Sequence, residues 1–322
     1  MKRLLVTGGA GFIGSNFIRH ILGKYSDYHI TNLDKLTYCG NLDNLKDVEK
    51  NGNYRFVKGD IADTTLANRL IKSCDIILNF AAETHVDRSI KDADSFVKTN
   101  VLGTYTLLEA AKASSVDLFI QISTDEVYGS ITEGKFREDG PLKPNSPYSA
   151  TKASGDLLAR SYFVTHGLPV IITRSSNNFG PYQYPEKIIP LFISNALGNK
   201  KLPVYADGMN MRDWLFVVDN CEAIDIVMHK GSPGEVYNIG GGKEITNLEL
   251  THAILDILDR DEGLIKFVKD RPGHDKRYAL DINKIKSLGW QPRHDFRNAL
   301  ELTIEWYKNN RAWWEKLKAC MK

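Results

Sequence analysis

The sequence of 322 residues lacks the features that mark several large classes of protein. Its 42 lysine and arginine residues nearly balance 40 aspartate and glutamate residues, which leaves a formal net charge of +2. A nucleic-acid-binding protein normally carries a clustered basic excess, so the balance argues against that class. No stretch reaches the roughly 18 uninterrupted apolar residues that a membrane span needs. The composition is that of a soluble globular protein, and the length predicts about two domains.

Cysteine is scarce as well, and no cysteine pair has the CxxC spacing of a metal or redox site. No HExxH pattern is present either, so no metal is expected. The amino-terminal MKRLLVTGG does not resemble a signal peptide, because Gly8 and Gly9 interrupt its apolar run. We therefore expect a cytoplasmic protein with reduced thiols. The four cysteines are Cys39, Cys74, Cys221 and Cys320.

Short β-branched apolar runs alternate with longer helical patterns over residues 1–175. Runs such as 75–80 are apolar on both faces, as is typical of parallel strands covered by helices on both sides. The alternation predicts an α/β fold with a doubly wound parallel Rossmann sheet. Crossover helices are expected near 11–22 and 95–113. Strands are expected at Arg3–Thr7, His29–Leu33, Tyr54–Lys58, Asp75–Phe80, Leu118–Ser123 and Val170–Arg174.

The pattern loosens after residue 175, where Gly, Pro and Asn become frequent. We interpret residues 1–175 as a dinucleotide-binding domain and 176–322 as a smaller, irregular domain that binds substrate. A segment at about 213–240, which starts with a strand and a helix at Trp214–Met228, is expected to return to the first sheet.

The glycine-rich segment TGGAGFIG at residues 7–14 follows the first expected strand and opens a helix. Two spacings fit a dinucleotide-binding turn: Gly9, Gly11 and Gly14, or Gly8, Gly11 and Gly14. Either gives a tight turn whose backbone N–H groups approach a pyrophosphate at a helix N-terminus. Glycines in such a turn can also be purely structural.

Asp34 ends the second expected strand, about 20 residues beyond the last glycine. A carboxylate there accepts hydrogen bonds from a ribose 2′-hydroxyl and repels a 2′-phosphate, which favours NAD over NADP. The adjacent Lys35 weakens this preference, and an ordinary turn acid is the alternative interpretation.

Tyr148 and Lys152 lie one turn apart in a helix expected over Pro147–His166, which the N-cap Ser146 and the stop signal Gly167 delimit. They share one face of this helix. A phenol acts as a base at neutral pH only if its pKa falls by about three units, or roughly 4 kcal/mol. A neighbouring ammonium and a nicotinamide cation together supply that stabilisation. A chance pair on a solvated helix is the alternative.

Thr124, Asp125 and Glu126 follow the fifth expected strand, at the strand ends where ligands bind in doubly wound sheets. Two adjacent carboxyl groups exceed what alcohol oxidation requires, so they indicate a second proton-transfer task. An exposed acidic turn is the alternative.

Together these segments resemble the extended short-chain dehydrogenase/reductase family, and within it the dTDP-glucose 4,6-dehydratases. The likeness extends over essentially the whole chain, with small departures such as Thr84 in place of an expected serine. It rests on TGGAGFIGSN (7–16), LDKLTY (33–38), AAETHVDRSI (81–90), STDEVYG (123–129), PYSATKA (147–153), NNFGPYQYPEKIIPL (177–191), MRDWLFVVDN (211–220) and DRPGHDKRYALD (270–281).

The resemblance implies a reaction in three steps. Tyr148, assisted by Lys152 and Thr124, removes the proton of the sugar 4-hydroxyl while a hydride passes to NAD. Glu126 then takes the C5 proton, and Asp125 protonates the departing 6-hydroxyl. The hydride returns to C6 as Glu126 reprotonates C5. The implied products are dTDP-4-dehydro-6-deoxy-glucose and water, on a route to deoxysugars such as rhamnose.

The resemblance also implies binding residues and a homodimer, in which two helices near 95–113 and 147–166 of each copy form a four-helix bundle. No nucleic acid or membrane partner is expected. NAD contacts are expected from Gly8, Gly11, Phe12, Ile13, Gly14, Asp34, Lys35, Leu36, Thr37, Asp60, Ile61, Ala81, Ala82, Thr84, Thr99, Tyr148, Lys152 and Asn178. Nucleotide-sugar contacts are expected from His85, Thr124, Asn177, Lys187, Ile188, Pro203, Tyr205, Arg212, Asn247, Asp270, Arg271 and His274.

The same residues argue against three other functions. A nucleotide-sugar 4-epimerase would share Tyr148 and Lys152 but would have no use for Asp125 and Glu126. A GDP-mannose 4,6-dehydratase is expected to use NADP, which Asp34 disfavours. A binding protein that only senses NAD would be expected to lose the Tyr–Lys pair or the acids, and this chain keeps all of them.

Overall fold

The computed structural model describes residues 1–270 and 273–320, and its centre is a seven-stranded sheet with the order β10-β6-β5-β4-β1-β2-β3. All neighbouring strands pair in parallel. The predicted α/β fold with a doubly wound sheet is confirmed, and each expected strand lies within one residue of its predicted ends. The strands are β1 (Lys2–Thr7), β2 (Tyr28–Asp34), β3 (Tyr54–Lys58), β4 (Ile76–Asn79), β5 (Leu118–Thr124), β6 (Val170–Ser175) and β10 (Val236–Ile239).

The apolar runs form strands because the sheet is covered on both faces. Successive residues of β1 enter different clusters: Leu4 and Val6 join the core on one face, and Leu5 joins the core on the other. All four residues of β4 and all six of β6 are buried. Continuous rather than alternating hydrophobicity is the pattern that two covered faces require.

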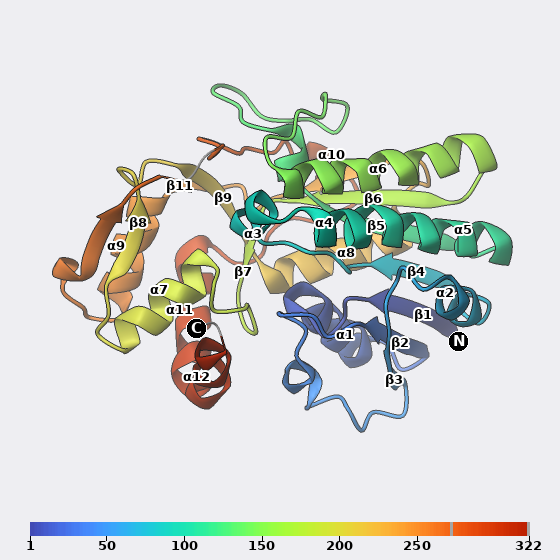
Figure 1. Cartoon of the computed structure of the whole chain (residues 1–322), viewed down its shortest axis with the longest axis horizontal. Helices are drawn as coiled ribbons and strands as arrows, with labels where there is room; N and C mark the ends of the chain where they lie inside the picture. The colour runs from blue at the N-terminus through green and yellow to red at the C-terminus, as the bar shows by residue number, and fades with distance from the viewer. Residues whose placement is uncertain (271–272, 321–322) are drawn as a thin grey trace.

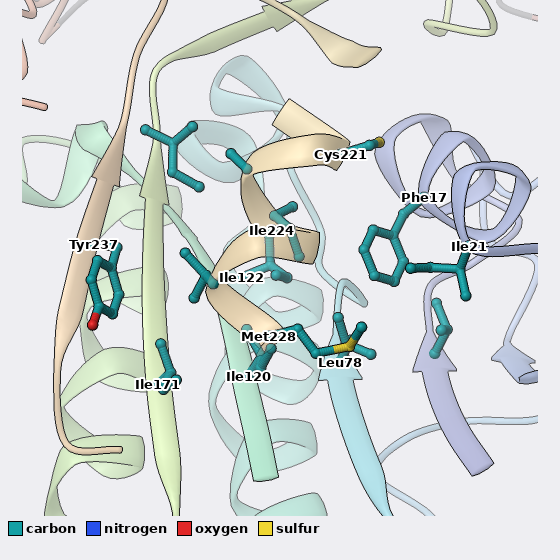
Figure 2. Packing of buried hydrophobic residues seen from close by; sticks show 14 of the residues in the cluster. Phe17, Ile21, Leu78, Ile120, Ile122, Ile171, Cys221, Ile224, Met228 and Tyr237 are labelled. Carbon is teal, nitrogen blue, oxygen red and sulfur yellow. The ribbon is translucent and has the colours of Figure 1, made fainter. Parts of the chain in front are cut away.

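Helices cover both faces of the sheet, as Figure 1 shows. Side chains of α1 and α8 fill the core on one face, and those of α2, α5 and α6 fill the core on the other. Figure 2 shows the first of these layers, where Phe17 of α1 and Met228 of α8 pack near Leu78 and Ile120 of the sheet. The helices are α1 (Phe12–Lys24), α2 (Thr64–Ile71), α5 (Thr104–Ser114), α6 (Pro147–His166) and α8 (Val217–Lys230).

The helix expected over 95–113 is interrupted. A short helix α4 (Asp94–Phe96) leads into a π-helical segment η2 (Val97–Gly103), which then continues into α5. The wide turn holds Asn100, whose side chain accepts from the Glu83 N–H at 2.9 Å and donates to Thr151 Oγ1 on α6 at 2.9 Å. A π-helical insertion of this kind is common next to functional sites.

The remaining elements form a smaller part beside the carboxyl ends of the sheet, coloured yellow to red in Figure 1. Its core contains Phe179, Phe192, Trp214 and Tyr307. The strands β7 (Asn177–Phe179), β9 (Met211–Phe216) and β11 (Glu244–Thr246) form one small sheet, and β8 (Leu202–Tyr205) and β12 (Ile265–Val268) form another. Its helices are α7 (Ile188–Leu197), α9 (Asn247–Ile257), α11 (Phe296–Asn309) and α12 (Arg311–Ala319).

The shorter elements of the structure are η1 (Leu42–Leu45), α3 (Val86–Lys91), η3 (Asp125–Tyr128), η4 (Glu262–Leu264) and α10 (Asn283–Ser287). The strand at Trp214 does not return to the large sheet, so that part of the prediction is wrong. It belongs to β9, which pairs with β7 and β11, and the strand that joins β6 is β10. No helix in the two described ranges is long and apolar enough to cross a membrane.

A buried carboxylate on α8 joins the two helices that cover the first face. Asp225 Oδ2 lies 2.6 Å from Lys24 Nζ and 2.9 Å from His20 Nε2, both on α1. The Tyr25 hydroxyl donates to the same carboxylate at 3.1 Å. Burial raises the pKa of Asp225, but the hydrogen bonds from His20 and Lys24 outweigh burial and hold the pKa at about 2.

We predict that Asp225→Asn destabilises the fold by about 1–3 kcal/mol at pH 7, the cost of weakening a buried hydrogen-bonded charge. The folded pKa lies below the unfolded one, so the carboxylate's contribution is complete above the unfolded pKa near 4 and is lost as pH falls toward 2. Denaturant unfolding should therefore show a larger difference from the unmodified protein at pH 7 than at pH 3. Equal differences at both pH values would contradict this role.

Candidate cofactor and catalytic site

A pocket opens at the carboxyl ends of the parallel strands. Gly8 and Ala81 follow β1 and β4, and Asp34, Thr124 and Ser175 end β2, β5 and β6; all five line it. The crossovers that leave β1 and β4 cover opposite faces of the sheet, which leaves a crevice between these strands. Ligands of doubly wound sheets bind at this topological switch point.

The glycine turn forms the floor of the pocket. Gly8 has φ +67°, and a Cβ there would lie 2.6 Å from the Ala81 nitrogen. A Cβ on Gly14 would lie 2.6 Å from the Gly8 carbonyl oxygen. Gly9 does not line the pocket, and its missing side chain makes room for Asn32 and Ile18. Of the two spacings that the sequence allows, Gly8, Gly11 and Gly14 therefore face the pocket.

The first turn of α1 begins after Gly11 and contains no acidic side chain. Its unpaired backbone N–H groups and the positive end of the helix dipole favour an anion at this position. The turn therefore has the geometry that a pyrophosphate requires.

Asp34 lines the pocket and also holds the turn together. Its Oδ2 accepts from the Ala10 N–H at 2.9 Å, and its Oδ1 accepts from the Leu36 N–H at 2.8 Å. Burial raises the pKa of Asp34, and these two backbone bonds oppose the rise. Lys35 lies 2.6 Å from Asp60 Oδ2, so its charge is already paired.

Tyr148 and Lys152 line the pocket from the first turns of α6. This helix starts as predicted, because Ser146 and Ser149 form a capping box at its N-terminus, and it ends at Gly167 in the left-handed conformation. Lys152 Nζ donates to the Ile122 carbonyl at 2.5 Å. Burial lowers the pKa of Lys152 to about 8, and the charge of Asp156 opposes that fall.

The protein by itself does not lower the pKa of the Tyr148 phenol. Burial raises its pKa, the Glu126 carboxylate raises it further, and hydrogen bonding with Thr124 opposes both. The protein alone thus keeps Tyr148 protonated. A lowered pKa requires additional positive charge beside the ring, as a nicotinamide cation would provide.

Asp125 is buried rather than part of an exposed acidic turn, so that alternative is wrong. Its Oδ1 accepts from Thr124 Oγ1 at 3.2 Å, and its Oδ2 has no hydrogen-bond partner. Burial raises the pKa of Asp125 well above its usual range, and the charges of Glu126 and Asp213 raise it further. The surroundings of Asp125 therefore favour its protonated form, the form that can donate a proton.

Polar atoms without partners gather around the pocket. Such buried atoms normally bond to protein, water or ligand, so they mark places for a polar ligand. With the glycine turn and Asp34, they fit a dinucleotide. No group of three or more His, Cys, Asp or Glu side chains among the described residues is arranged to hold a metal ion. The unpartnered atoms belong to Ser176, Asn177, Asn178, Gln183 and Glu186.

The pocket brings together every residue expected to contact the cofactor except Leu36, which has φ +57° and does not line it. Of the residues expected to contact substrate, Thr124, Asn177 and Lys187 line the pocket. Arg271 lies outside the described residues. The expected residues that do not line it are His85, Ile188, Pro203, Tyr205, Arg212, Asn247, Asp270 and His274.

These outlying residues do not line the pocket, and several of them contact other parts of the chain. Arg212 donates to the Asp275 carbonyl at 2.8 Å and acts on Asp125 only through its charge, which lowers the pKa of Asp125. His274 Nδ1 lies 2.6 Å from Asp270 Oδ1. His85 reaches the pocket wall indirectly, because its Nε2 lies 3.6 Å from Glu186 Oε2.

Several lining residues were not predicted from the sequence. All of them except Gly59 lie within two residues of the segments that carry the family resemblance, and Gly59 directly precedes the predicted Asp60. Adjacency to these residues was the signal that could have found them. They are Leu33, Tyr38, Cys39, Gly40, Gly59, Phe80, Glu83, Ile122, Ser123, Ser175, Ser176, Tyr182, Gln183, Tyr184 and Glu186.

Residues 5–303 match the GDP-mannose 4,6-dehydratase family. The chain belongs to this family. Among its relatives, the low-salt glycan biosynthesis protein Agl12 of Haloferax volcanii is 56% identical over 304 residues, which cover 94% of this chain and 98% of that protein. A dTDP-glucose 4,6-dehydratase of Streptomyces niveus is 54% identical over 322 residues, covering 98% and 96% of the two chains.

A solved structure agrees with this membership. DesIV, a dTDP-glucose 4,6-dehydratase from Streptomyces venezuelae crystallised with NAD, superposes with a TM-score of 0.96 at 51% identity. The match covers 98% of this chain and 99% of DesIV. The resemblance inferred from the sequence is thereby confirmed.

We predict that Asp34→Ala weakens NAD binding roughly 10- to 100-fold, which corresponds to about 1.5–3 kcal/mol for a hydrogen bond to a charged group. Removing the charge should also relax the rejection of NADP. Calorimetric titration of both cofactors measures the two effects. Asp34→Asn is the matched variant, because its side chain has the same shape and keeps one oxygen that can accept a hydrogen bond from the backbone of the turn. Equal affinity of the unmodified protein for NAD and NADP would show that Asp34 does not select the cofactor.

Proposed function

We propose that this protein is an NAD-dependent dTDP-glucose 4,6-dehydratase, which converts dTDP-glucose to dTDP-4-dehydro-6-deoxy-glucose and water. The observation that carries the proposal is the buried Asp125 beside Glu126, in the pocket that also holds Tyr148 and Lys152. Alcohol oxidation needs one proton acceptor, whereas elimination of water also needs an acid and a base. The relatives that carry this name at about half identity support the choice of reaction.

The residues present suit NAD as the cofactor. Gly8, Gly11 and Gly14 with the N-terminus of α1 would hold its pyrophosphate, and Asp34 would bind a ribose hydroxyl. When held by these residues, NAD would supply reversible hydride transfer, so that C4 oxidation and C6 reduction would cause no net consumption of the cofactor.

Tyr148 is the proposed base for the sugar 4-hydroxyl. Because burial keeps its phenol protonated, deprotonation needs positive charge nearby, and Lys152 provides part of it from the same face of α6. Thr124 hydrogen-bonds to Tyr148 and helps to orient it.

The two carboxyl groups have different environments and therefore different proposed roles. Asp125 is fully buried, and burial raises its pKa, so it is the proposed acid that protonates the leaving 6-hydroxyl. Glu126 is only half-buried, and its own N–H donates to Thr124 Oγ1 at 3.2 Å. It is the proposed base that takes the C5 proton and returns it after elimination. Different environments for two neighbouring carboxyl groups are a common arrangement for paired acid and base catalysis.

The product is proposed to enter deoxysugar assembly, with rhamnose as one destination. A cytoplasmic location is proposed because the four cysteines are free thiols, which that compartment keeps reduced. A nucleotide-sugar 4-epimerase is the alternative activity, but it gives the buried Asp125 no role.

Incubation of the purified protein with NAD and dTDP-glucose tests the proposal. We expect the alkali-induced absorbance of a 4-keto sugar and a product lighter than the substrate by one water. GDP-mannose and UDP-glucose, supplied separately, test the other nucleotide sugars. A product of unchanged mass with inverted C4 would establish the epimerase instead.

We predict that Glu126→Gln separates oxidation from elimination. The substitution keeps the side-chain shape and removes the base, so dehydration should fall roughly 10²–10⁴-fold. Oxidation at C4 should survive better, and NADH absorbance should accumulate after substrate is added. Tyr148→Phe is the matched variant, since it should suppress the NADH signal itself. Normal turnover of Glu126→Gln without NADH accumulation would remove the main support for the dehydratase.

We also propose that two copies pair through α6 and the η2–α5 segment, which lie side by side in Figure 1. Apolar side chains are exposed along both: Val97 (49%), Tyr105 (45%), Leu157 (58%) and Val164 (63%). Ala153 of α6 does not belong to this surface, because it is buried in the core. Two such helices from each copy would form a four-helix bundle.

We predict that Leu157→Glu together with Val164→Glu dissociates this dimer, because charges would then be buried in an apolar interface. Light scattering should report about twice the 36.3 kDa chain mass for the unmodified protein and a mass near 36.3 kDa for the variant. Met209→Glu, at an equally exposed apolar residue outside α5 and α6, is the control that should leave the mass unchanged. A monomeric unmodified protein at micromolar concentration would contradict the proposal.

A further inference from the structure

A third ionisable residue continues the line of Tyr148 and Lys152 along α6. Asp156 follows Lys152 by four residues, as Lys152 follows Tyr148, so the three share one face of the helix. All three are buried, but only Tyr148 and Lys152 line the pocket. Asp156 therefore lies behind the lysine, away from any bound substrate or cofactor.

Arg174 of β6 holds Asp156 in place. Its Nε donates to Asp156 Oδ2 at 2.9 Å, and the two side chains are 6% and 1% exposed. The Arg174 guanidinium also donates to the Tyr128 hydroxyl at 2.7 Å, which in turn donates to Asn238 Oδ1 at 2.8 Å. Contacts from β6, η3 and β10 thus fix the position of this carboxylate.

Arg174 engages only one oxygen of Asp156. Hydrogen bonding with the Ser123 hydroxyl of β5 also lowers the pKa of Asp156. Both partners favour the carboxylate form of Asp156, so a negative charge is held one turn from Lys152.

The charged groups around Lys152 come from three elements. Tyr148 and Asp156 lie on α6, Asp125 and Glu126 on η3, and Arg174 on β6. Among the described residues, the charge that acts most strongly on Lys152 is that of Asp156. Burial raises the pKa of Asp156 itself, and Arg174 opposes this rise.

We propose that Asp156 is a positioning residue for the reaction: held by Arg174, it places a negative charge one turn behind Lys152 and keeps that buried ammonium protonated beside Tyr148. The catalytic meaning of this inference rests on the proposed function. The alternative is a buried ion pair that only fastens α6 to β6.

The protonation of Lys152 can be measured without any substrate. Protein labelled with ¹³C at lysine Cε is titrated by NMR, and the Lys152 signal is assigned with Lys152→Met. Asp156→Asn should lower the titration midpoint of Lys152 by about one to three pH units, the usual effect of one nearby charge. Asp156→Glu and Arg174→Lys, which both retain the carboxylate, should leave it within about half a unit. An unchanged midpoint in Asp156→Asn would overturn the proposal.

If Asp156→Asn does not fold, Asp156→Asn/Arg174→Gln removes both charges and leaves neither one buried alone. The Lys152 midpoint should fall in this double variant too. A midpoint equal to that of the unmodified protein would reject the role of Asp156.

The pH dependence of turnover then distinguishes positioning from anchoring. With a lower Lys152 midpoint, Asp156→Asn should lose at least about fivefold in kcat at pH 8 and a clearly smaller factor at pH 6. Arg174→Lys should lower the melting temperature without shifting the pH at which kcat falls on the alkaline side. Equal losses at both pH values would indicate anchoring only. If the unmodified protein does not act on dTDP-glucose, the proposed function fails, while the NMR titration still decides the role of Asp156.

Discussion

A buried chain of side-chain hydrogen bonds aligns the strand ends on which the site depends. Thr7 Oγ1 donates to Asn79 Oδ1 at 2.7 Å, and Asn79 Nδ2 donates to Gln121 Oε1 at 2.9 Å. These residues lie in register on β1, β4 and β5. Because the strands run parallel and in register, the turns that follow them meet at one edge. The glycine turn and the acid pair therefore converge although more than 100 residues separate them.

Exclusion of water sets the proton affinities of the groups at that edge. Burial raises the pKa of Asp125 and Tyr148 and lowers that of Lys152 to about 8. All three shifts favour neutral forms, as expected where charges lose their hydration. Charge must then come from specific partners, such as Asp156 behind Lys152. In this proposal, the Asp156–Arg174 ion pair serves the site although neither residue lines the pocket.

The smaller part of the molecule also makes hydrogen bonds that hold segments of the cofactor pocket in place. Trp313 of α12 donates to Asn44 Oδ1 at 3.0 Å, close to the segment 38–40 that lines the pocket. The Tyr307 hydroxyl of α11 donates to the carbonyl of Gln183, another lining residue. The carboxyl-terminal helices thus hold both lining segments, so the pocket depends on residues at opposite ends of the chain.

The sequence alone determined the features that depend only on residues close together in the chain. Strand hydrophobicity, the Ser146 cap, the spacing of Tyr148 and Lys152 and the glycine turn are local, so they indicated the sheet, α6 and the cofactor edge correctly. Tertiary structure decided which glycine spacing faces the pocket, that Leu36 turns away and that Arg212 bonds to backbone carbonyls. It also decided that the pKa of Asp125 is raised, because burial and the charges around a residue come from segments that only folding brings together.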